Sequence, residues 1–150
     1  MREIDNPGKW WKRFLNLSIH VSIWSKDPST KVGAVITQGN LVQSIGFNGP
    51  PRGVSDNEVT REIRLLTTIH SEVNAVLTAK QDLTGASLFC THPSCANCAA
   101  VIIQSGIVRV VCIKPETEFE GRWLESSRQA EILFKEAGVE YFCVDPEYLI

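Results

Sequence analysis

Residues 86–113, ASLFCTHPSCANCAAVIIQSGIVRVVCI, hold the pattern that decides the fold class. ASLFCTH (residues 86–92) predicts a strand. The apolar residues of CANCAAVIIQSG predict a helix that ends at Gly106, in the position of a C-terminal cap. VRVVCI (residues 108–113) predicts the next strand. A helix that lies between two strands in this way is typical of an α/β protein.

The rest of the chain continues this alternation of strands and helices. Apolar residues at helical spacing predict a first helix that starts at Trp10 and ends near Ser25. Two strand-like runs joined by QGN predict a β-hairpin. The hairpin strands are 32–37 and 41–48. The remaining predicted elements are a strand at 139–144 and helices at 69–80 and 123–138. We therefore predict one domain over residues 1–150, an α/β fold in which a five-stranded mixed sheet lies between two layers of helices.

Residues 48–68 interrupt the alternation with a long loop. The stretch contains two Pro and two Gly and no convincing strand, although a short helix over NEVTREIRLL (residues 57–66) is an alternative interpretation. Loops of this length inside a compact domain are often functional lids. The loop either closes over a substrate or serves a neighbouring subunit, and the sequence leaves both open.

The composition excludes several classes of protein. Among 150 residues, 43% are hydrophobic and 21% are charged, as in an ordinary globular protein. Fifteen Lys and Arg against 17 Asp and Glu give a net charge of −2, which disfavours a polynucleotide partner. We expect no membrane span, because no apolar stretch reaches the roughly 20 residues required, and no secretion signal at the N-terminus. The expected location is the cytoplasm, where five cysteines favour metal binding or buried thiols over disulfides.

Cys95 and Cys98 open the predicted helix of residues 95–106 at positions i and i+3, so both sulfurs point the same way. The positive end of the helix dipole favours their thiolate forms. By itself this C-x-x-C pattern allows a redox pair, half of a structural zinc site or half of a catalytic zinc site.

The triplet HSE at residues 70–72 supplies the missing partner. His70 with the two cysteines makes three ligands, and a catalytic zinc takes three protein ligands and keeps one position for water. Glu72 suits a proton carrier better than a ligand beside two thiolates. A structural site requires a fourth ligand, for which the candidates are Cys90, His92, Cys112 and Cys143. These cysteines lie in apolar strand patterns, where cysteine usually packs as a small hydrophobe, and His92 serves equally well in a turn or against substrate.

H-x-E followed by a P-C-x-x-C-like segment is the signature of zinc-dependent nucleobase deaminases. Within that group the chain resembles the deoxycytidylate deaminases, enzymes of the cytidine-deaminase-like fold. The resemblance rests on SKDPSTKVGAVIT, GFNGPPRGVSD, IHSEVNAV and THPSCANCAAVIIQSGI, which occur in the family's order over residues 25–107. One departure is Ser94, which stands where the family commonly has Pro before the first cysteine. We expect the metal to bind nonetheless.

The resemblance implies a role for each of these residues. Zn²⁺ held by His70, Cys95 and Cys98 lowers the pKa of its water, and Glu72 moves protons between that water, ring N3 and the departing amine. The backbone N–H of Ser71 would bind the base carbonyl, and Asn48 would bind the sugar hydroxyl. Apart from the resemblance, a 5′-phosphate requires positive charge near the site, and Lys31 and Arg52 are the candidates for it.

The expected reaction converts dCMP to dUMP with release of ammonia and so supplies dUMP for thymidylate synthesis. The alternatives are deamination of dCTP by the same chemistry and a non-catalytic, zinc-stabilised module that binds nucleotides. The resemblance further implies a homo-oligomer, with a hexamer favoured, and dCTP and dTTP as effectors together with Mg²⁺.

Overall fold

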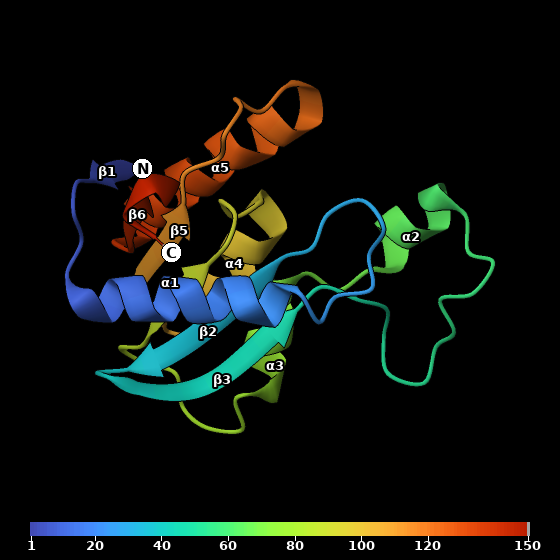
Figure 1. Cartoon of the computed structure of the whole chain (residues 1–150), viewed down its shortest axis with the longest axis horizontal. Coiled ribbons are helices and arrows are strands. Elements are labelled where there is room, and N and C mark those ends of the chain that lie inside the picture. The colour runs from blue at the N-terminus through green and yellow to red at the C-terminus, as the bar shows by residue number, and fades with distance from the viewer. Residues whose placement is uncertain (150) are drawn as a thin grey trace.

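The computed structural model describes residues 1–149 and contains one mixed sheet between layers of helices (Figure 1). In chain order the strands are β1 (Arg2–Ile4), β2 (Gly33–Gln38), β3 (Leu41–Phe47), β4 (Ser87–Cys90), β5 (Arg109–Ile113) and β6 (Glu140–Val144). Their spatial order is β1-β6-β5-β4-β2-β3. β2 is antiparallel to β3 and β4, whereas β4, β5, β6 and β1 are parallel to one another. The predicted α/β class and mixed sheet are confirmed.

The sheet has six strands, so the predicted count of five is one too low. The additional strand is β1, which pairs in parallel with β6, Arg2 opposite Phe142 and Ile4 opposite Val144. Its sequence REI shows neither an apolar run nor an alternation long enough to indicate a strand. β1 therefore forms because it pairs with the edge of β6, which exists only in the folded sheet.

Helices cover both faces of the sheet. In chain order they are α1 (Lys9–Ser22), α2 (Arg61–Thr67), α3 (Ser71–Thr78), α4 (Ala96–Gln104), α5 (Gly121–Ala137) and a 3₁₀ turn, η1 (Pro146–Tyr148). α1 packs on one face, and α3, α4 and α5 pack on the other. This arrangement confirms the three-layer α/β/α prediction.

Alternation along β4 directs its side chains to opposite sides of the sheet. Phe89 packs in the core beneath α1, whereas Leu88 and Cys90 belong to the core shared with α3 and α4. Cys90 is the last residue of β4. Its thiol therefore lies beneath the helices that begin just beyond the carboxyl end of the strand.

The segment between β3 and α3 projects from the body of the molecule and carries α2, as Figure 1 shows. The short helix that was the alternative interpretation for 57–66 is present, but it starts later, at Arg61. Thr60 caps it by accepting a hydrogen bond from the N–H of Ile63. At the base of the segment, Gly49 and Ile69 form a bridge with N···O distances of 3.1 and 2.9 Å. That bridge places both ends of the long loop beside His70.

Two glycines, one after α4 and one on β3, occupy positions that other residues would not fit. Gly106 follows the end of α4 with a φ of +90°, as the predicted helix stop requires. Gly46 on β3 lies against α3, where a Cβ would collide with the backbone of Ser71 and Ala75. Glycine at this position thus allows α3 to approach the sheet closely.

Within residues 1–149, no helix is both long and apolar enough to cross a membrane.

Candidate metal centre

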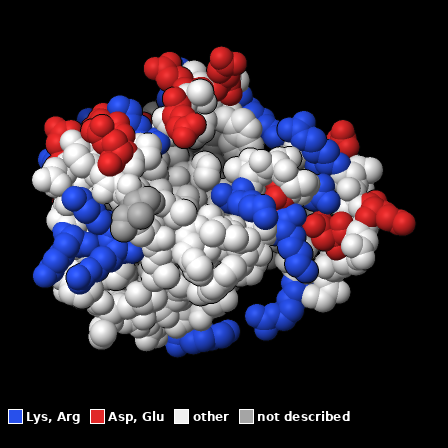
Figure 2. Space-filling model, in the orientation of Figure 1, with Lys and Arg blue, Asp and Glu red and all other residues white. Residues whose placement is uncertain are grey.

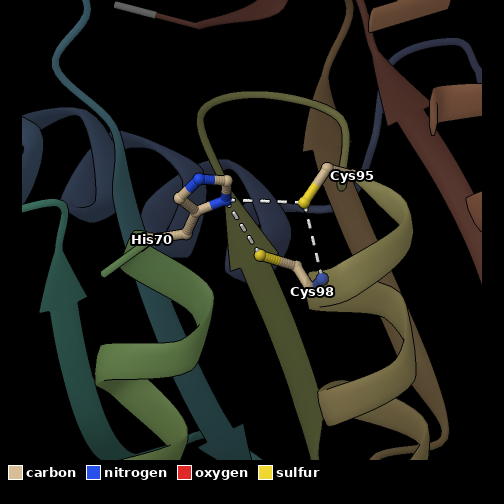
Figure 3. Close-up of side chains that lie close together, drawn as sticks. All are labelled: His70, Cys95 and Cys98. Carbon is tan, nitrogen blue, oxygen red and sulfur yellow. Dashed lines mark hydrogen bonds between the residues drawn. The ribbon is translucent and has the colours of Figure 1, made fainter. Parts of the chain in front are cut away.

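The first residues of α3 and α4 meet beyond the carboxyl end of β4. His70 is the N-cap of α3, Cys95 is the N-cap of α4, and Cys98 lies in the first turn of α4. Figure 3 shows the imidazole of His70 and the two sulfurs pointing toward one another. The two motifs that the sequence separates by more than twenty residues are therefore brought together by the fold.

The spacing of these ligand atoms suits a tetrahedral metal. The Nδ1 of His70 lies 3.2 Å from the Sγ of Cys98 and 3.4 Å from the Sγ of Cys95, and all three atoms lie within 4.8 Å of one another. Zinc bonds of about 2.0 Å to nitrogen and about 2.3 Å to sulfur place tetrahedral ligand atoms roughly 3.5–3.8 Å apart. The donor set and its compactness therefore fit Zn²⁺ with only small adjustments.

The two thiols differ in how readily they lose a proton. A hydrogen bond from Cys98 and a further one with His70 outweigh the effect of burial and lower the pKa of Cys95 to about 4. The backbone N–H of Cys98 also lies 3.4 Å from that sulfur. The pKa of Cys98 is raised by its hydrogen bond to Cys95, by burial and by the charge of Glu72. Cys95 is therefore the preformed thiolate of the pair, and Cys98 gives up its proton when a cation binds.

His70 responds to the same neighbours. Its pKa is raised mainly by the hydrogen bond to Cys95, an effect that burial partly opposes. A metal that binds Nδ1 replaces this hydrogen bond, because only the neutral ring offers a lone pair.

Glu72 lies in the first turn of α3 and is 4% exposed. Its Oε1 accepts a hydrogen bond of 2.7 Å from the hydroxyl of Ser71 and one of 3.5 Å from the thiol of Cys90. The compact ligand group consists of His70, Cys95 and Cys98 and does not include Glu72. A carboxylate beside the metal ligands, but outside their group, suits proton transfer.

No fourth ligand joins the group within residues 1–149. Cys90 bonds to Glu72, the thiol of Cys112 contacts the Sδ of Met1 at 3.4 Å, and the Nδ1 of His92 lies 2.8 Å from the hydroxyl of Thr91. Burial lowers the pKa of His92, so this ring is neutral in its turn. Three protein ligands leave a coordination position for water, which distinguishes catalytic from structural zinc.

Asn48 is buried directly after β3, and its side chain forms hydrogen bonds with the backbone of residues 30–32. Its Oδ1 accepts a hydrogen bond of 2.9 Å from the N–H of Val32, and its Nδ2 donates one of 2.9 Å to the carbonyl of Thr30. The hydroxyl of Ser25 also donates to the Asn48 carbonyl, at 2.8 Å. An amide side chain has two acceptor and two donor positions, so one of each is left after these bonds.

The two cations expected near the phosphate are both exposed. Lys31 lies directly before Val32, and Arg52 lies in the loop that follows Gly49. Neither forms an ion pair with any residue of the described chain. Figure 2 shows Lys and Arg side chains gathered between the body of the molecule and the projecting α2 segment.

Ser94 is buried and takes part in a contact that the sequence did not reveal. Its backbone N–H donates a hydrogen bond of 3.0 Å to the hydroxyl of Tyr141 on β6. A proline at this position has no N–H to donate. The Oγ of Ser94 is buried without a partner in the described chain. Tyr141 was not a predicted site residue, because its contact with Ser94 depends on strand order.

A model of the cytidine and deoxycytidylate deaminase zinc-binding region matches residues 8–114. A protein of Aliivibrio fischeri described as an uncharacterized deaminase is 52% identical over 135 residues, which are 89% of this chain and 92% of that protein. The mouse deoxycytidylate deaminase is 33% identical, and the match covers 96% of this chain and 84% of the mouse protein.

A solved structure shares the fold. The dCMP deaminase of cyanophage S-TIM5, in its apo form, superposes with a TM-score of 0.74 at 23% sequence identity and covers 91% of this chain and 98% of its own. The range 8–114 includes His70, Glu72, Cys95 and Cys98.

Proposed function

Because the chain belongs to the cytidine and deoxycytidylate deaminase family, we propose that it catalyses the zinc-dependent hydrolysis of dCMP to dUMP and ammonia. The observation that carries the proposal is the buried carboxylate of Glu72 beside a three-ligand group formed by His70, Cys95 and Cys98. The mouse relative named above is a deoxycytidylate deaminase, which supports a cytosine nucleotide as the substrate.

The metal and Glu72 divide the chemistry between them. When bound by His70, Cys95 and Cys98, Zn²⁺ supplies a hydroxide nucleophile at neutral pH by lowering the pKa of water. Glu72 accepts the proton of that water and delivers it to N3 of the cytosine ring, which makes C4 more electrophilic. The carboxylate then helps to protonate the amine, which leaves as ammonia.

The residues around the site orient the nucleotide. The backbone N–H of Ser71, at the start of α3, would donate to the base carbonyl, and Asn48 would bind the sugar hydroxyl with its remaining hydrogen-bonding positions. Lys31 and Arg52 would provide positive charge for the 5′-phosphate. The product dUMP would supply thymidylate synthesis.

The test is a comparison of substrates with the purified zinc-loaded protein. dCMP, dCTP, deoxycytidine and cytidine are incubated separately, and the loss of cytosine absorbance and the release of ammonia are measured. We expect dCMP to have the highest kcat/KM. A higher kcat/KM for dCTP would mean that the nucleoside triphosphate is the substrate. If none of the four compounds is deaminated, the protein is a non-catalytic nucleotide-binding module.

The same preparation tests the expected assembly and regulation. We propose a homo-oligomer, with a hexamer favoured, whose activity responds to dCTP and dTTP in the presence of Mg²⁺. Light scattering coupled to gel filtration gives the mass, and assays at subsaturating dCMP with each effector give the response. A monomer, or rates indifferent to both nucleotides, would contradict this part of the proposal.

A further inference from the structure

We propose that the side chains of Ser71 and Cys90 are positioning residues that hold the Glu72 carboxylate by Oε1 and leave Oε2 to carry the proton. The proposal rests on the deaminase function given above and adds to it the means by which the proton carrier is oriented. Neither side chain was assigned a catalytic role from the sequence, where Ser71 was expected to act through its backbone and Cys90 as a buried hydrophobe.

The geometry joins two elements at one oxygen atom. The Oγ of Ser71 lies 2.7 Å from the Oε1 of Glu72, and the Sγ of Cys90 lies 3.5 Å from the same atom. Ser71 belongs to the first turn of α3, whereas Cys90 ends β4. The carboxylate is therefore fixed relative to the sheet as well as to its own helix.

Burial makes these contacts stronger constraints than they would be on the surface. Ser71 and Cys90 are both 0% exposed, and Glu72 is 4% exposed. A carboxylate removed from water requires hydrogen-bond donors, and an unpartnered one is costly. Since both donors bind Oε1, they fix the rotation of the carboxylate and leave Oε2 free of these two hydrogen bonds.

Both groups have a proton available for Glu72. Burial and the negative charge of Glu72 raise the pKa of Cys90 well above its ordinary value, so its thiol remains a donor. The hydroxyl of Ser71 has one proton, which its 2.7 Å contact directs to Oε1. The Oγ of Ser71 and the Sγ of Cys90 are themselves 3.8 Å apart, so the three side chains form one closed group.

The decisive variant is Ser71→Ala, which removes the hydroxyl but keeps the backbone N–H proposed to bind the base. We expect kcat for dCMP to fall by about 10- to 100-fold, with KM and zinc content unchanged, as for other outer partners of a catalytic metal site. The matched control is Ser18→Ala, because Ser18 is equally buried, on α1 across the sheet, and its hydroxyl donates to the carbonyl of Leu15 at 2.7 Å. The control should keep the wild-type kcat.

A second variant tests the other element and does not depend on the folding of the first. Cys90→Val should lower kcat less than Ser71→Ala does, because a thiol is a weak donor. Its matched control is Cys112→Val, since Cys112 lies opposite Cys90 on β5 and is similarly buried. Zinc content and the thermal midpoint of unfolding are measured for all four proteins.

The Glu72→Gln background separates positioning from a purely structural role. If Ser71 and Cys90 act through Glu72, adding Ser71→Ala or Cys90→Val to Glu72→Gln should cause no further loss of the residual rate. Three outcomes would overturn the inference. The residual rate of Glu72→Gln could fall as much as the wild-type rate does, kcat could fall only in parallel with zinc content, or both single variants could keep full activity. An inactive wild-type enzyme would instead overturn the proposed function, so the two failures are distinguishable.

Discussion

Individual side chains at the metal centre differ in what they contribute before a metal binds. Cys95 is held as a thiolate, while Cys98, with its pKa raised, keeps its proton and is the more deeply buried of the two. His70 shares its Nδ1 between the two sulfurs. The three ligand atoms thus already lie close together, and a bound cation would replace the hydrogen bonds between them.

The substitution Cys98→Ala removes one of only three ligands and should abolish stoichiometric zinc binding. Elemental analysis of the purified variant by mass spectrometry provides the measurement. Cys143→Ala is the matched control, because Cys143 is also a buried thiol but lies outside the ligand group. Full zinc content in Cys98→Ala would show that the metal is bound elsewhere.

The substitution Glu72→Gln keeps the size of the side chain but removes its capacity to accept and release a proton. We expect zinc to remain bound and kcat to fall by about 10²- to 10⁴-fold, which is the range for a general acid–base group. Steady-state assays with dCMP and a parallel zinc determination give the two quantities. Glu136→Gln, on the exposed surface of α5, is the control; an active Glu72→Gln enzyme would reassign the proton carrier.

At the scale of secondary-structure elements, local patterns predicted the site better than they predicted its surroundings. Cys95 and Cys98 share one helix turn, and His70 and Glu72 open another, so spacing alone placed each pair on a helix start. The support around them depends on contacts between elements. The Cys90–Glu72 hydrogen bond joins β4 to α3, and such pairings are not encoded in local periodicity.

The boundaries of helices and strands also depend partly on local sequence and partly on contacts between elements. The alternation of apolar runs predicted five strands, whereas β1 depends on the edge of β6 that it joins. The predicted helix 69–80 is shorter in the structure, α3 (Ser71–Thr78), because His70 is its cap and Lys80 has a positive φ of 55°. A residue's backbone conformation at such an end is decided by the packing of the next segment.

The hydrogen bond from Ser94, in the turn before α4, to Tyr141 on β6 leads to a prediction about stability. Tyr141→Phe removes the acceptor for the buried N–H of Ser94 and should lower the free energy of unfolding by about 1–3 kcal/mol. Denaturant unfolding of the zinc-loaded protein measures the change. The zinc content should stay the same, because none of the three metal ligands is altered.

A double-mutant cycle tests the cause of that loss. In a Ser94→Pro background the N–H is absent, so Tyr141→Phe should cost much less than it does in the wild-type chain. Equal costs in both backgrounds would mean that the Tyr141 hydroxyl stabilises the protein through another contact.

At the scale of the whole molecule, two of the places where distant parts of the chain meet bear on stability. β1 pairs with β6, so the first strand lies beside the last, and the amino group of Met1 lies 2.7 Å from the Oε2 of Glu131 on α5. The proposed metal ligands lie at the starts of α3 and α4, beyond the end of β4. α3 and α4 share a hydrophobic core, and a zinc ion bound by His70, Cys95 and Cys98 would add a further link between them. We therefore expect the stability of the molecule to depend on zinc.

Removal of zinc should therefore lower the thermal midpoint of unfolding of the entire protein. A ligand present at about 1,000 times its Kd, and bound only by the folded state, stabilises that state by about 4 kcal/mol. Scanning calorimetry before and after treatment with a chelator, and again after Zn²⁺ is restored, gives the reversible part of the change. Cys98→Ala is the control, since its midpoint should not respond to either treatment. A wild-type midpoint that also ignores the chelator would mean that α3 and α4 are held by packing alone, and that the metal contributes chemistry without stability.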